Sequence, residues 1–150
     1  MATSASTAAA RVLSIIVIVA GAIMIIAGAV TWFTVQSQLK DEKITVSDDA
    51  ERFAGKQVKG PFTAYTEANT IEKHTLAATG GKTYAELGRD DPARQTAMTG
   101  SFLRASLFTS VVAFGVAAMA AGLGVVFILL GVALLSLINA LASPPRGAVS

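Results

Sequence analysis

The amino-acid sequence predicts an integral membrane protein, mainly α-helical, in which a hairpin of two transmembrane helices carries a small α+β module inserted between the spans. Three observations predict this class. Two uncharged runs are each long enough to cross a bilayer, the chain is 53% hydrophobic and only 15% charged, and all ten acidic and ten of the twelve basic residues lie between Lys40 and Arg104. We therefore divide the chain into a disordered tail (1–11), a first span (12–35), the module (36–104), a second span with an interfacial extension (105–142) and a second tail (143–150).

The first span is an uncharged run of 24 residues from Val12 to Val35. As a helix it would be about 36 Å long, which is enough to cross a hydrocarbon core of about 30 Å. Trp32 and Phe33 lie at its end, where interfacial aromatic residues are common. A cleaved signal peptide is the alternative, because residues 27–29 have a small-x-small form. The run continues past that site, however, and is longer than a signal peptide's apolar region, so we favour an uncleaved signal-anchor helix.

The second uncharged run extends over 36 residues, from Leu107 to Ala142. A single helix of that length would be about 54 Å long, well beyond the bilayer core. We expect one tilted span, whose remainder emerges as an interfacial helix around 134–142. Pro144 and Pro145 would end it.

Small residues recur every seven positions in both runs, which marks one face of a helix that packs closely against a partner. This stripe predicts either an antiparallel hairpin within the chain or a face for another subunit, although Gly and Ala are common enough in membrane helices for a stripe to arise by chance. The predicted helix-packing residues are Ser14, Gly21 and Gly28 in the first span, and Ser110, Ala117, Gly124 and Gly131 in the second.

The front of the module has a strand signal. Ile44 and Val46 alternate with polar residues, the Ser-Asp-Asp sequence that follows favours a turn, and residues 53–60 give a weaker signal for a return strand. These features are the basis of the predicted β component.

The rest of the module is predicted to be helical. Gly60-Pro61 favours a helix from Phe62 to about Ala78, ended by a left-handed cap at Gly80-Gly81. The spacing of Thr83 and Glu86 is that of a capping box, which predicts one short helical turn. Asp91-Pro92 then begins a helix that can run without interruption into the second span.

Few residues suggest chemistry. The chain has no cysteine, and its single histidine, His74, is expected to be a solvated helix residue. Two carboxylate pairs, Asp48-Asp49 and Asp90-Asp91, suit caps and turns, and they are not at a spacing recognised for a metal ion. We therefore predict no catalytic, metal or cofactor-binding residue, and no enzyme activity.

Four aromatic residues of the module are the candidate recognition residues. We expect them to form its small core, with a partner-binding patch as the alternative interpretation. They are Phe53, Phe62, Tyr65 and Tyr84.

The charge pattern bears on partners and on sidedness. Basic and acidic residues alternate closely in the module, so no basic face is available to bind nucleic acid. The first span has Arg11 before it and a balanced Lys-Asp-Glu-Lys sequence after it, which favours cytoplasmic tails and an extracytoplasmic module. The basic residues at the ends of the module favour the opposite orientation, but a segment of this length can be translocated regardless of its charge.

Three segments of the sequence resemble a known family: "EKITVSDDAERFAGKQVKGPFTAYTEA", "GGKTYAELGRDDPARQTAM" and "SFLRASLFTSVVAFGVAA". Over roughly Thr31 to Leu135 the chain resembles a family of actinobacterial two-span membrane proteins of unknown function, whose members are often labelled aromatic ring-opening dioxygenases. That label implies a non-haem iron held by two histidines and a carboxylate. With His74 alone, one copy of this chain cannot supply the histidines, so the label does not fit the sequence.

These observations leave three hypotheses about function. We favour a small non-enzymatic membrane protein, an accessory or scaffold subunit that binds a larger membrane complex or an envelope partner, or associates with itself, through its module and hairpin. An oligomeric pore is the alternative, although the uncharged spans argue against a hydrophilic lumen. An enzyme at the membrane surface, using the module's carboxylates and His74, is a third possibility.

Overall fold

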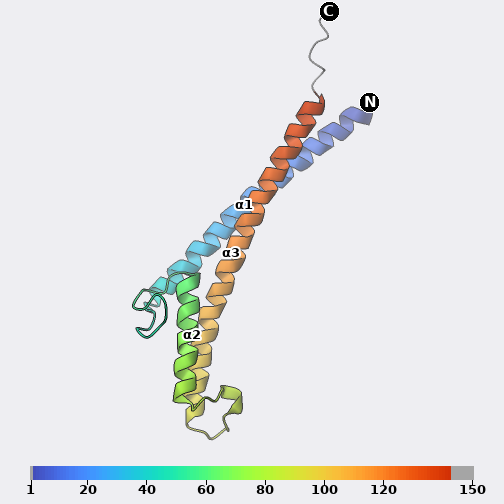
Figure 1. The fold of residues 1–150 in the computed structure, drawn as a ribbon. Coiled ribbons are helices and arrows are strands. Elements are labelled where there is room, and N and C mark those ends of the chain that lie inside the picture. The colour runs from blue at the N-terminus through green and yellow to red at the C-terminus, as the bar shows by residue number, and fades with distance from the viewer. Residues whose placement is uncertain (1, 143–150) are drawn as a thin grey trace, which may run out of the picture. The chain divides into compact units, whose positions relative to one another are not determined.

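The computed structural model describes residues 2–142, with side chains from Thr7 onward, as helices joined by loops (Figure 1). The long helices are α1 (Ala2–Asp41), α2 (Pro61–Ala78) and α3 (Ala93–Ala142), and a short 3₁₀ helix, η1, covers Tyr84–Glu86. Contacts divide the chain into two compact units. We call residues 1–30 with 117–150 the hairpin unit and residues 31–116 the module unit.

Two helices, Thr7–Asp41 within α1 and α3 itself, have the length and composition needed to cross a membrane. In their most apolar windows only 17% and 11% of the residues are buried. The core helix of a soluble protein would be mostly buried, so the exposure of these apolar surfaces favours a bilayer as their surroundings. The prediction of a mainly helical chain with two such helices is confirmed.

α1 begins earlier than the sequence predicts. Residues 2–11, for which we expected disorder, already belong to the helix. The segment is rich in alanine, the strongest helix former, and it continues directly into a long helix, so no new nucleation is required. At the other end, Lys43 adopts a left-handed conformation (φ 53°) and its amide donates to the carbonyl of Lys40 (3.1 Å), which ends the helix.

The α+β prediction is wrong in its β component: no strand is present within residues 2–142. The two expected strand segments do meet, but only at an isolated antiparallel bridge between Thr45 and Gln57. Tight turns occupy most of the residues between them, and the backbone is left-handed at Phe53 (φ 59°) and Gly55 (φ 68°). Too few residues therefore remain extended to form a ladder.

α2 and the N-terminal part of α3 follow the sequence signals. Pro61 is the first residue of α2, and left-handed glycines at positions 80 and 81 follow its end. The amide of Ala93 donates to the side chain of Asp91 (2.9 Å), as expected of a cap at the start of α3.

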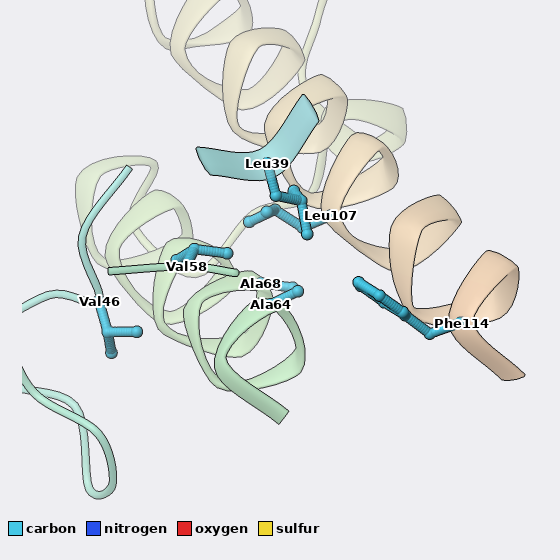
Figure 2. Close-up of a cluster of buried hydrophobic side chains, with 7 residues drawn as sticks. All are labelled: Leu39, Val46, Val58, Ala64, Ala68, Leu107 and Phe114. Carbon is cyan, nitrogen blue, oxygen red and sulfur yellow. The ribbon is translucent and has the colours of Figure 1, made fainter. Parts of the chain in front are cut away.

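Within the module unit α2 lies beside α3 (Figure 1), and two kinds of contact hold the pair together. Tyr65 and Phe108 stack edge to face with ring centroids 5.7 Å apart, and Glu72 forms a salt bridge of 2.8 Å with Arg104. The core of this unit contains alanine and aliphatic side chains and one phenylalanine, contributed by both helices, the end of α1 and the bridge segments (Figure 2). Its buried members are Leu39, Val46, Val58, Ala64, Ala68, Leu107 and Phe114.

Candidate functional site

The hairpin unit brings the predicted small residues of α1 and α3 face to face. A methyl group added at Gly21 would lie 2.5 Å from the carbonyl oxygen of Gly124, and one at Gly28 would lie 2.6 Å from that of Ala117. One at Gly131 would lie 2.9 Å from the carbonyl oxygen of Ser14. The backbones thus approach too closely for any larger residue at these positions.

These contacts repeat in layers seven residues apart along both helices, with antiparallel register. Such a period keeps one face in contact over a long distance and corresponds to a left-handed crossing. Near the other end of the pair, Arg11 donates a hydrogen bond to the side-chain oxygen of Asn139 (3.2 Å). Ser110, the remaining predicted packing residue, is half-buried in the module unit and donates its hydroxyl to the carbonyl of Ser106 (3.2 Å).

Two further glycines of α3, Gly115 and Gly122, make no such close contact. Nothing lies within 4 Å of a methyl group added at Gly115 or Gly122. Ala118, four residues before Gly122, is also exposed. The spacing of Ala118 and Gly122 is the small-xxx-small pattern that lets another membrane helix approach closely. Sequence reasoning missed this pair because it followed only the seven-residue stripe.

The four aromatic candidates do not form the module's core, which corrects our first interpretation of them. Phe62 is 75% exposed, Tyr65 51%, and Phe53 and Tyr84 more than a third. The buried core is formed instead by other residues, among them Ala64 and Ala68 of α2 and Leu107 and Phe114 of α3.

Three of these aromatics line one groove of the module unit. Phe53, Phe62 and Tyr65 surround a cavity of about 590 Å³ that Val111 of α3 also lines. Charged side chains line the same cavity, from the loop before α2 and from α2 itself: Asp49, Glu51, Arg52 and Lys73. We call this cavity the aromatic groove. Its size is that of an ordinary small-molecule site.

The loop that carries Phe53 is held by two contacts to α2. The buried carboxylate of Glu67 accepts hydrogen bonds from the amide (2.7 Å) and the hydroxyl (3.0 Å) of Ser47. Asp49 Oδ2 and His74 Nε2 lie 2.7 Å apart. That hydrogen bond, helped by the charge of His74, lowers the pKa of Asp49 below its ordinary value of 3.8. His74 is half-exposed, as the sequence predicts, but it acts as a loop tether.

The backbone of Phe53 is itself unusual, because a bulky residue rarely adopts a positive φ. Such a conformation persists only where the surrounding contacts enforce it. Lys56 lies over the ring, 5.6 Å from its centroid, and the loop places the ring at the edge of the aromatic groove.

Tyr84 lies apart from the other three aromatics, on η1. The guanidinium of Arg94 lies 4.0 Å from the centroid of its ring and donates to the carbonyl of Leu87 (2.5 Å). The capping box predicted for this turn is present: the amide of Thr83 donates to Glu86 (2.8 Å), and its hydroxyl does so too (2.7 Å). These hydrogen bonds lower the pKa of Glu86. The arrangement stabilises a turn.

The described side chains include no group of three or more His, Asp or Glu residues placed to hold a metal ion. Comparison of the chain with protein-family models, with curated proteins and with solved structures gives no match.

Proposed function

We propose that this chain is a small, non-enzymatic integral membrane protein, an accessory or scaffold subunit that binds a transmembrane helix of another membrane protein through the Ala118–Gly122 face of α3. The two apolar helices support a location in a bilayer, and the contrast among the glycines supports a binding role there.

The observation that carries the proposal is the open space at Gly122 and Gly115. Glycine weakens a helix interior by about 0.5–1 kcal/mol relative to alanine, so its presence normally has a structural reason. For Gly21, Gly28, Gly124 and Gly131 the reason is the close contact within the hairpin. For Gly115 and Gly122 no contact within the described chain supplies one. A helix of another protein that docks over Ala118 and Gly122 would supply that reason.

The sidedness that accompanies this proposal is tails in the cytoplasm and the module outside it. Its support is the charge distribution around the first span alone.

Purification of the full chain from its own membranes in mild detergent tests the proposal. We expect a stoichiometric membrane protein to copurify with the native chain and to be lost from Gly122→Leu. Ala29→Leu is the matched control, because it makes a similar change at an exposed position of α1. Recovery of the native chain as a lone monomer, or equal recovery of the partner with both variants, would contradict the proposal. A discrete homo-oligomer lost only in Gly122→Leu would identify the partner as a second copy.

A further inference from the structure

We propose that the aromatic groove binds one membrane phospholipid, with its phosphate at Arg52 and Lys73 and the start of an acyl chain against Phe62, Tyr65 and Val111. This inference rests on the module unit alone and is independent of the helix face proposed above.

The first argument is the composition of the groove along its length. Phe62, Tyr65 and Val111 give it one apolar wall. Lys73 is eleven residues after Phe62 on α2, about 16 Å further along the helix, and Arg52 lies on the facing loop. A ligand that fills the groove must therefore be apolar over part of its length and polar over the rest.

The second argument is the level of the groove along α3. Arg104 is the last charged residue of this helix, and the uncharged run begins at Leu107. Val111 is seven residues beyond Arg104, about 10 Å toward the apolar side. On α2, Glu72 pairs with Arg104, whereas Tyr65 stacks on Phe108, so the Phe62 end of the groove lies on the apolar side of that salt bridge. The groove thus extends across the boundary where lipid headgroups meet acyl chains, a level at which exposed aromatic rings are favourable.

The third argument is charge. Within residues 2–142, neither Arg52 nor Lys73 forms a salt bridge. The carboxylate of Asp49, by contrast, is engaged by His74 at 2.7 Å. Arg52 and Lys73 lie outside any salt bridge of the described chain, although Lys73 also interacts electrostatically with Asp49, and two such cations suit a phosphodiester. The carboxylate of Glu51 suits the ammonium group of a zwitterionic headgroup.

Titration of the full-length protein with lipid, followed by native mass spectrometry from detergent micelles, tests this proposal. The probes are phosphatidylethanolamine, phosphatidylglycerol, a diacylglycerol with the same chains, and inorganic phosphate. We expect a one-to-one adduct with the phospholipids, and binding at least tenfold weaker for diacylglycerol and for inorganic phosphate. Tighter binding of phosphatidylethanolamine than of phosphatidylglycerol would indicate that Glu51 binds the ammonium group. Equal binding of the two would indicate recognition of the phosphate alone.

The variant Arg52→Gln with Lys73→Gln should weaken phospholipid binding about 25-fold, because each cation near a phosphate contributes about fivefold. The matched control, Lys82→Gln with Arg89→Gln, removes the same charge from the module outside this groove. Phe62→Ala should also weaken binding, and its ring is exposed enough for the fold to tolerate the loss. Equal binding of diacylglycerol, equal effects of the two double variants, or the absence of any phospholipid adduct would each overturn the proposal.

Discussion

Substitution of one glycine of α3 by alanine should have opposite effects at two positions only two residues apart. Gly124 faces Gly21 across the hairpin, and a methyl group there would lie 2.5 Å from its carbonyl oxygen. Gly122 has nothing within 4 Å of the same added group. Comparison of Gly124→Ala with Gly122→Ala separates the steric effect of a methyl group from its effect on helix propensity, because both residues are interior to one helix.

The magnitude follows from these distances. Alanine gains up to about 1 kcal/mol over glycine at either position through helix propensity. At Gly124, ordinary contact begins near 3.4 Å, so the two backbones must separate by about 0.9 Å. A gap of that size forfeits a quarter to a half of the local dispersion energy, and overpacking of this kind costs about 1–3 kcal/mol. Gly124→Ala should therefore be about 1–3 kcal/mol less stable than Gly122→Ala.

Reversible unfolding of the purified monomer in mixed micelles, followed by circular dichroism, measures this difference directly. Gly122→Ala should equal or exceed the native chain in stability, and Gly124→Ala should fall below it. Equal unfolding free energies for the two variants would refute the close backbone contact between α1 and α3.

Three further predictions concern the module unit. Gly100→Ala should destabilise the full chain by about 1–3 kcal/mol in the same unfolding assay, because its methyl group would overlap the hydroxyl and methyl of Thr75, and Thr75→Ala should restore part of the loss. Without such rescue the packing of α2 on α3 would need revision. Glu67→Ala should lower the free energy of unfolding by about 1–3 kcal/mol, since it removes the buried acceptor of two hydrogen bonds from Ser47. Glu67→Gln keeps one acceptor and should lower it less. An unchanged stability of Glu67→Ala would contradict the role of Glu67 in holding the loop. The lowered pKa of Asp49 means that its contribution to stability is fully present above about pH 4 and is lost as the pH falls through the lower folded value. Unfolding measured between about pH 5 and pH 3 should therefore depend less on pH in Asp49→Asn, and an unchanged pH profile would argue against the contact with His74.

α2 and the start of α3 could be predicted because each has an explicit local signal, whereas the start of α1 lacks one and was predicted ten residues too late. Gly60-Pro61 and Gly80-Gly81 bound α2, and Asp91-Pro92 begins α3, so propensity and capping agree at each boundary. The strand prediction failed because alternating residues at Ile44 and Val46 indicate an extended segment but do not indicate how many residues will pair. That number depends on the left-handed turn at Phe53, and nothing in the sequence marks a phenylalanine for a positive φ.

The candidate sites could be predicted only in part. The seven-residue stripe identified residues that meet across the hairpin, since period alone places small residues on one face. The aromatic groove could not be found in this way. It depends on the packing of Tyr65 against Phe108 and on a loop held by Glu67. The sequence reveals that Phe62 is large and apolar, but its exposure follows from which face of α2 meets α3.

The central claim is that the chain crosses the membrane twice and presents its module on one side. Because the chain contains no cysteine, a single cysteine placed at Thr7 or at Asp90 reports one position alone. Labelling of intact cells with a membrane-impermeant maleimide, before and after permeabilisation, compares the two. We predict opposite behaviour, with Asp90→Cys labelled in intact cells and Thr7→Cys labelled only after permeabilisation. Equal labelling of both positions in intact cells would contradict the two-span account.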